Sequence, residues 1–160
     1  MTDLEHAAAA LLEHLQARGL LVATAESCTG GLIAASLTAI AGSSASVDRG
    51  FVTYSNAAKT EMLGVPEALI ADKGAVSAEV AGRMAEGALA RSRADLAVSV
   101  TGVAGPGGGS PTKPVGLVWF GTMRRGGMVA TSHHVFPGDR TAVRAATVLE
   151  AFRLLDRLAG

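Results

Sequence analysis

The segment Leu20-Leu21-Val22-Ala23-Thr24-Ala25-Glu26-Ser27-Cys28-Thr29-Gly30-Gly31 decides the fold, because its character changes twice along its length. It begins with apolar residues, continues with hydroxyls and a carboxylate, and ends in two glycines before an apolar run at 32–37. This pattern predicts a strand at 20–25, a sharp turn and a helix at 31–41. Such a turn presents a side chain at the end of a sheet and directs backbone N–H groups toward the space in front of it. Ser27 is therefore a candidate nucleophile; the alternative is an ordinary turn with a capping serine or threonine.

Strand and helix patterns alternate along the rest of the chain. Further strands are predicted at 50–55, 96–101, 115–122 and 128–135, the last two joined by a hairpin. Helices are predicted after the capping residues Thr2, Asn56, Ser77 and Asp139. The order predicts a three-layer α/β/α sandwich with a mixed, mostly parallel sheet of about five strands that contains one hairpin. The length predicts a single domain over 1–160.

Composition and charge argue against several classes of function. The 14 lysines and arginines balance the 14 aspartates and glutamates, so the chain lacks the positive charge of a nucleic-acid-binding protein. The single Cys28 excludes an internal disulfide and a cysteine-cage metal site. No histidine belongs to an HExxH motif, and the adjacent His133 and His134 are predicted on opposite faces of a strand, which disfavours a metal pair. We therefore predict no metal and no other cofactor.

Hydrophobic residues make up 49% of the chain, but no apolar run approaches the roughly 20 residues that span a membrane. The N-terminus has no basic stretch followed by an apolar one, so we expect a cytoplasmic protein without a membrane partner. A hydrophobic chain of this size also favours a homo-oligomer, such as a dimer.

Three segments rich in polar or glycine residues follow predicted strands. They are the Ser27 turn, the corner at 54–59 and a glycine-rich loop at 101–114. Because open α/β sheets bind ligands beyond the carboxyl ends of their strands, we expect these segments to meet at one site. The loop contains neither a GxGxxG dinucleotide fingerprint nor a GxxxxGKS/T phosphate loop.

Lys59 is the best candidate base for Ser27. A serine is a poor nucleophile without a base, and no histidine lies near these turns in the sequence, although His133 or His134 could reach the site across space. With Asn56 as the helix cap, Lys59 lies in the first helical turn, where the helix dipole and burial both lower the pKa of an amine. The alternative is a surface lysine.

Other residues of the three segments are candidate catalytic or ligand contacts. Tyr54 is predicted to relay a proton or to stack on a ring, or else to be a half-buried strand tyrosine. Backbone N–H groups at the start of the second helix are predicted to form an oxyanion hole or to hold a phosphate, and the loop glycines permit close approach of a ligand. The alternative for the loop is a flexible surface segment. These binding candidates are Thr29, Gly30, Gly31, Thr101, Gly102 and Gly105.

Two residues beside Ser27 have open roles. Glu26 either orients the turn or is solvated. Cys28 is a rival nucleophile, which we expect to be an unreactive thiol because no histidine neighbours it in the sequence.

Several short blocks, spread over nearly the whole chain, occur in an order typical of one protein family. The blocks are 25–31, 41–44, 50–56 with Lys59, 74–77, 102–106, 108–110 with 113–116, and 136–140 with 143–144. On these blocks the chain resembles the CinA carboxy-terminal domain family, which includes stand-alone nicotinamide-nucleotide amidohydrolases.

The resemblance implies deamidation of nicotinamide mononucleotide to nicotinic acid mononucleotide and ammonia, without a metal, in pyridine nucleotide recycling. It implies a serine nucleophile at Ser27 and a lysine base at Lys59, with Tyr54 close by. It also makes Arg140, in the Gly-Asp-Arg part of its block, a candidate for holding the substrate phosphate.

Two positions depart from the family pattern. Relatives often carry an acidic residue in place of Gly107 and a threonine in place of Leu117, so loop order or ligand contacts could differ. Two other functions stay open on the sequence. One is a non-catalytic nucleotide- or partner-binding module, and the other is an esterase or amidase acting on a different small ligand.

Overall fold

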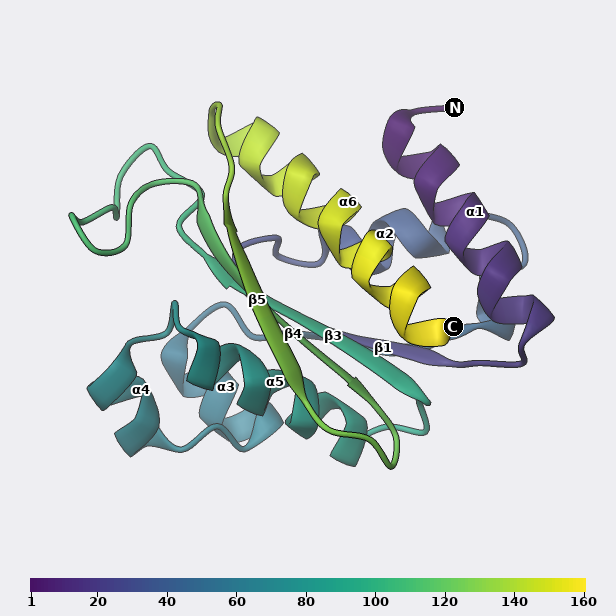
Figure 1. Ribbon diagram of the computed structural model, residues 1–160, viewed down its shortest axis with the longest axis horizontal. Helices are drawn as coiled ribbons and strands as arrows, with labels where there is room; N and C mark the ends of the chain where they lie inside the picture. The colour runs from purple at the N-terminus through teal and green to yellow at the C-terminus, as the bar shows by residue number, and fades with distance from the viewer.

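The structure, a computed structural model, describes residues 1–160 and contains a five-stranded sheet with helices on both faces (Figure 1). In chain order the elements are α1 (Asp3–Ala17), β1 (Val22–Glu26), α2 (Leu32–Thr38), the 3₁₀ turn η1 (Ser43–Ala45), β2 (Val47–Val52), α3 (Asn56–Leu63), α4 (Glu67–Lys73), α5 (Ala78–Ala90), β3 (Leu96–Gly102), β4 (Leu117–Arg124), β5 (Ala130–Val135) and α6 (Arg140–Ala159). The predicted three-layer α/β/α sandwich is confirmed.

The sheet has the strand order β2-β1-β3-β4-β5 and is mixed, as predicted. β1 pairs in parallel with β2 and β3, whereas β3–β4 and β4–β5 are antiparallel pairs, so β4 alone runs against the other strands. The predicted hairpin is the β4–β5 connection. Because β1, β2 and β3 run the same way, their carboxyl ends lie at one edge of the sheet, and the turns that follow them converge there.

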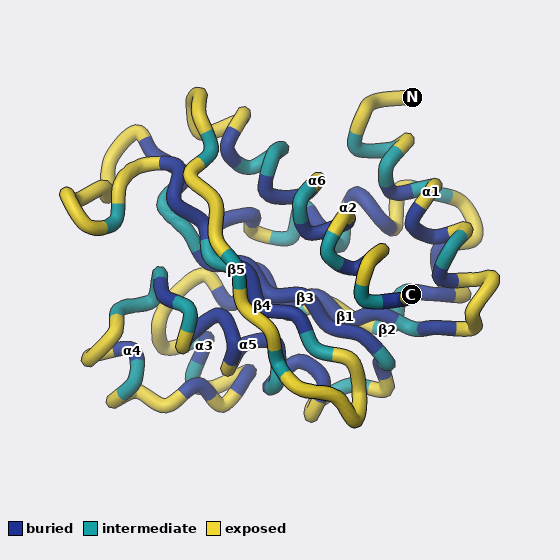
Figure 2. The backbone as a smooth tube through the Cα atoms, in the orientation of Figure 1, coloured by how far each residue is buried: buried dark blue, intermediate teal, exposed yellow.

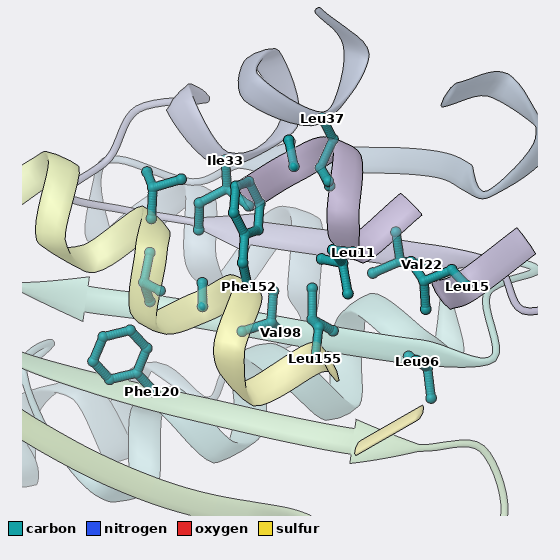
Figure 3. Packing of buried hydrophobic residues seen from close by; sticks show 14 of the residues in the cluster. Leu11, Leu15, Val22, Ile33, Leu37, Leu96, Val98, Phe120, Phe152 and Leu155 are labelled. Carbon is teal, nitrogen blue, oxygen red and sulfur yellow. The ribbon is translucent and has the colours of Figure 1, made fainter. Parts of the chain in front are cut away.

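The two faces of the sheet bury unequal hydrophobic cores. Helices α1, α2 and α6 cover one face, and α3, α4 and α5 cover the other (Figure 1). The first face buries a cluster of 21 residues, in which Phe152 and Leu155 of α6 lie over Val98 (Figure 3). The second buries 11 residues, among them five alanines. Alternation along each strand divides the side chains, so Val98 belongs to the larger cluster and Ala97 to the smaller.

Burial falls from the centre of the sheet toward both edges, since the edge strand β2 contains no buried residue. Every residue of β1 is buried, whereas β5 is largely exposed (Figure 2). None of the helices combines the length and the apolar character needed to cross a membrane.

Three of the four predicted helix caps are confirmed, and one is wrong. The hydroxyl of Thr2 and the carboxylate of Asp139 accept backbone N–H bonds at the starts of α1 and α6, and Ser77 caps α5. At α3 the cap is Ser55 instead of Asn56, because Ser55 has the extended backbone and its hydroxyl accepts the N–H of Ala58 at 3.0 Å.

Several boundaries also differ from the predicted ones. The predicted strand at 50–55 lies at 47–52, because the chain turns after Val52 and its next carbonyls face Lys59. The predicted helix at 31–41 is shorter, since α2 ends at Thr38. The other strands move by one or two residues at their ends, as is usual for sequence-based boundaries.

The contact between α3 and α5 gives a stability prediction. A Cβ atom at Gly87 of α5 would overlap the carbonyl oxygen of Leu63 in α3, whereas one at Gly82 would meet Thr131 at an ordinary 3.5 Å. We therefore expect Gly87→Ala to lower the free energy of unfolding by about 2 kcal/mol or more through overpacking. Gly82→Ala, on the same helix, is the control and should raise it by up to about 1 kcal/mol through helix propensity. Urea unfolding of both variants checks this, and equal effects at the two glycines would contradict it.

Candidate active site

A cavity of about 250 Å³ lies where the three segments meet beyond the carboxyl ends of the parallel strands. Its wall is formed by Ser27, Cys28, Tyr54, Asn56, Lys59, Ala75, Val76, Thr101, Gly102, Ala104 and Arg140. The expectation that the three segments share one site is therefore confirmed. The cavity lies just under the range of roughly 300–1,000 Å³ that is usual for sites of small ligands.

Ser27 and Lys59 are in direct contact in this wall. Lys59 Nζ donates a hydrogen bond to Ser27 Oγ at 2.9 Å. Lys59 is only 1% exposed and Ser27 8%, so the pair is shielded from water. The side chain of Lys59 points back toward the start of α3, as helical side chains do, and this direction carries its amine to the end of β1. The alternative of a surface lysine is wrong.

The other partners of Lys59 are backbone carbonyls of the β2–α3 corner. Its Nζ donates to the carbonyl of Thr53 at 2.9 Å and to that of Tyr54 at 3.2 Å, with Ser55 O at 3.5 Å. No carboxylate contacts the amine. Burial lowers the pKa of Lys59 from its ordinary value of 10.5, because the charged form loses its hydration. A lowered pKa is what a lysine needs if it is to accept a proton near neutral pH.

Cys28 is next to Ser27 in the wall but is chemically unlike it. Burial raises the pKa of the Cys28 thiol to about 11, since the thiolate would be poorly solvated there. The thiol is therefore neutral at physiological pH, which fits the prediction of an unreactive cysteine.

Tyr54 and Arg140 form the rim of the cavity. Arg140 donates from Nη1 to the carbonyl of Gly105 at 2.9 Å and from Nη2 to the hydroxyl of Tyr54 at 3.3 Å. Tyr54 is 62% exposed and follows β2, so the alternative of a half-buried strand tyrosine is wrong. The guanidinium thus links the β2–α3 corner to the loop after β3, with an aromatic ring beside it.

Glu26 orients the turn, which is one of the two roles predicted for it from the sequence. Its carboxylate is fully buried and accepts three hydrogen bonds, from the hydroxyl of Thr29 at 2.6 Å and from the N–H groups of Ile33 and Ala34 at 2.8 and 3.0 Å. The carboxylate therefore occupies the donors of the first turn of α2. The N–H of Gly30 is also occupied, since it donates to the carbonyl of Ser27 at 3.0 Å.

The predicted binding residues divide into two groups. The structure brings Thr101, Gly102 and Arg140 into the cavity with Ser27, and Gly105 lies at its rim through its bond with Arg140. It does not bring in the first three residues of the α2 turn. The first of them donates its hydroxyl to Glu26 and accepts from Arg144 at its carbonyl, and none of the three lines the cavity. These residues are Thr29, Gly30 and Gly31.

Some wall residues carried little signal in the sequence. Asn56 was predicted only as a helix cap, and Ala75, Val76 and Ala104 have no reactive side chains. The backbone N–H groups of Cys28 and Ala104 donate to no other backbone group, and the same is true of Thr29 and Gly31 outside the wall. The two departures from the family pattern lie outside the wall: Gly107 is open to solvent and Leu117 is buried in β4.

Comparison with known proteins identifies the family. The model of the CinA C-terminal domain matches residues 4–159. The chain belongs to the CinA C-terminal domain family. It is 60% identical over 130 residues to the nicotinamide-nucleotide amidohydrolase PncC of Enterobacter agglomerans, covering 81% of this chain and 79% of that protein. It is 55% identical over 141 residues to the PncC of Escherichia coli K12, covering 88% and 86%.

Longer relatives and solved structures agree with this assignment. A CinA-like protein of Akkermansia muciniphila is 54% identical over 135 residues, but the match covers 84% of this chain and only 33% of that protein. The crystal structure of the competence/damage inducible protein CihA from Agrobacterium tumefaciens superposes with a TM-score of 0.96 at 53% identity, covering 100% of this chain and 98% of that one.

The buried carboxylate at the α2 turn gives a second stability prediction. Glu26→Gln replaces one accepting oxygen with an N–H₂ group that faces backbone donors, so we expect the free energy of unfolding to fall by about 1.5–3 kcal/mol. The matched control is Glu61→Gln on the exposed face of α3, for which a change within about 0.5 kcal/mol is expected. Denaturant unfolding of the two variants measures the difference. An unchanged Glu26→Gln variant would show that the carboxylate does not hold the turn.

Proposed function

We propose that this protein is a nicotinamide-nucleotide amidohydrolase that converts nicotinamide mononucleotide to nicotinic acid mononucleotide and ammonia. The observation that carries the proposal is the 2.9 Å contact between Ser27 Oγ and Lys59 Nζ in the wall of a cavity. A nucleophile in contact with a buried amine is the arrangement of a serine amidohydrolase with a lysine base. The substrate is suggested by the PncC relatives at 55–60% identity.

In this proposal the neutral amine of Lys59 is the base. Its two N–H bonds go to the carbonyls of Thr53 and Tyr54, which leaves the nitrogen lone pair directed at the Ser27 hydroxyl. The hydroxyl proton passes to Lys59 as Oγ bonds to the carboxamide carbon, and a tetrahedral oxyanion forms. Lys59 then gives this proton to the amide nitrogen, and the C–N bond breaks with loss of ammonia. Water attacks the resulting ester, its proton goes to Lys59 and then to Ser27, and the carboxylate product leaves.

Backbone and rim groups supply the remaining contacts. We assign the oxyanion to the free N–H groups of Cys28 and Ala104, since an N–H directly after the nucleophile is well placed for this role. We assign the substrate phosphate to the guanidinium of Arg140, which offers several donors to phosphate oxygens. Tyr54 positions Arg140 or stacks on the substrate ring. The proposal gives no ligand contact to the residues of the α2 turn that lie outside the cavity.

We extend the proposal to the whole segment 1–160 as one amidohydrolase domain, because the family match covers 4–159 and the five strands form one sheet. The cytoplasmic location and the homo-oligomeric state stay predictions, as does the absence of a metal from the reaction.

Ammonia release from nicotinamide mononucleotide tests the proposed dyad. We expect Ser27→Ala and Lys59→Met each to lower kcat by at least about 10³-fold, because nucleophile and base act as a unit. Lys59→Arg should be as inactive as Lys59→Met, since a guanidinium stays protonated and cannot act as the base. Lys73→Met, the same change at an exposed lysine, should leave activity near wild type.

Three results would count against the proposal. Full activity of Ser27→Ala would end its assignment as the nucleophile. Calorimetric binding of the mononucleotide by wild type without release of ammonia would favour a non-catalytic binding module. Turnover of other amides or esters, with none of nicotinamide nucleotides, would assign a different substrate.

The pH dependence follows from the direction of the Lys59 shift. The reactive form is the neutral amine, so kcat/KM should rise with pH as Lys59 loses its proton and then level off. Because burial lowers this pKa, the rise should be complete below the ordinary lysine value of 10.5. A pH–rate profile of the wild type measures it. A rate that falls through the same range would mean that the protonated amine is the active form.

A further inference from the structure

Lys113 connects two parts of the cavity wall without lying in the wall itself. It belongs to the glycine loop, defined here as residues 103–116 between β3 and β4. Its Nζ donates a hydrogen bond to the carbonyl of Lys73 at 2.6 Å. That carbonyl is at the C-terminal end of α4, where helix carbonyls lack partners within the helix and a positive charge is favoured.

Gly74 leaves room for this contact. It follows α4 with a φ of +79°, and a Cβ atom there would lie 2.5 Å from Lys113 Nζ. A side chain at this position would therefore displace the ammonium as well as strain the backbone. The space over Gly74 is filled by the lysine from the other segment.

The glycine loop is held together around Lys113. At its tip the N–H of Ser110 donates to the carbonyl of Lys113 at 2.8 Å, and the N–H of Lys113 donates to Ser110 Oγ at 3.1 Å. At its base the N–H of Gly116 donates to the carbonyl of Val103 at 2.7 Å. Between base and tip lies Ala104, a wall residue of the cavity. The position of Lys113 is therefore coupled to that of the cavity wall, because the loop between them is short and internally hydrogen-bonded.

Directly after the accepting residue Lys73 comes the connector 74–77 between α4 and α5. Ala75 and Val76 of this connector line the cavity. The connector is tied to β3 by the hydroxyl of Thr101, which donates to the carbonyl of Ala75 at 2.9 Å. No side-chain hydrogen bond joins residues 74–77 directly to the glycine loop. The nearest one is the bond from Lys113 to the carbonyl of Lys73, the residue that immediately precedes the connector.

We propose that Lys113 is a positioning residue for substrate binding, which latches the glycine loop to the end of α4 at Lys73, directly before the connector 74–77, and so sets the distance between two walls of the cavity. The free enzyme then holds Ala104 and Val76 in place before the substrate arrives. Without the latch, the two segments must be ordered when the substrate binds, and this ordering weakens binding. The chemical step at Ser27 does not use Lys113, so the latch acts on KM.

The expected kinetic result rests on the proposed amidohydrolase activity. With nicotinamide mononucleotide, Lys113→Met should raise KM roughly fivefold, the effect of one partly exposed charged hydrogen bond, and change kcat by less than about twofold. Lys113→Arg should have a KM near wild type, because a guanidinium can donate to the same carbonyl. Lys73→Met is the matched control. It removes a lysine side chain at the same place but keeps the accepting carbonyl, so its KM should be that of wild type.

Hydrogen exchange provides a readout that needs no activity. In the free protein, amides of 103–116 and 74–77 should exchange faster in Lys113→Met than in wild type or Lys73→Met. Unchanged KM and unchanged exchange in Lys113→Met would overturn the latch, as would a loss of kcat at constant KM. A lower melting temperature without faster exchange in these two segments would also overturn it. If the wild type releases no ammonia, the proposed function fails, and the exchange comparison alone then decides on the latch.

Discussion

The site depends on one constraint. An amine buried away from water needs hydrogen-bond partners, but these partners must not favour its protonated form. Lys59 meets it with backbone carbonyls and the Ser27 hydroxyl, and no carboxylate is near. A carboxylate there would stabilise the ammonium and raise the pKa of the lysine. The corner after β2 supplies carbonyls because the chain leaves the sheet at that point. The fold thereby lowers the pKa of a side chain that is ordinarily strongly basic.

A second buried charge, on Glu26 next to Ser27 in the sequence, is held in the opposite way. The carboxylate of Glu26 is buried as well, but three donors hold it, two of them from the first turn of α2. This arrangement fixes the turn that presents Ser27, and it occupies two of the N–H donors that an open helix start offers to anions. In the proposed reaction, the negative charge that develops on the substrate is met elsewhere, at the N–H groups of Cys28 and Ala104, which donate to no other backbone group.

The sequence predicted the architecture well because the patterns that specify it are local. Alternating apolar residues, glycines and capping side chains placed the strands and most helix starts, and the strand ends marked where Ser27 and Lys59 would meet. It could not separate Ser55 from Asn56 as a cap, since both residue types cap helices well and only the backbone angles decide. It also predicted that the α2 turn belongs to the site, because no local pattern shows that the Glu26 carboxylate already accepts hydrogen bonds from that turn. Wall residues such as Ala104 contribute main-chain atoms to the cavity, so the identity of their side chains does not reveal them in the sequence.

The contact at Gly87 has a consequence for the position of Lys59. α3, which carries Lys59, rests on α5 where a glycine meets the main chain of Leu63. The spacing of the two helices is set there by backbone atoms, which every sequence has, and no side chain can be repacked at that point. The depth at which Lys59 enters the site is therefore set by a main-chain contact and does not depend on which side chains fill the rest of the smaller core.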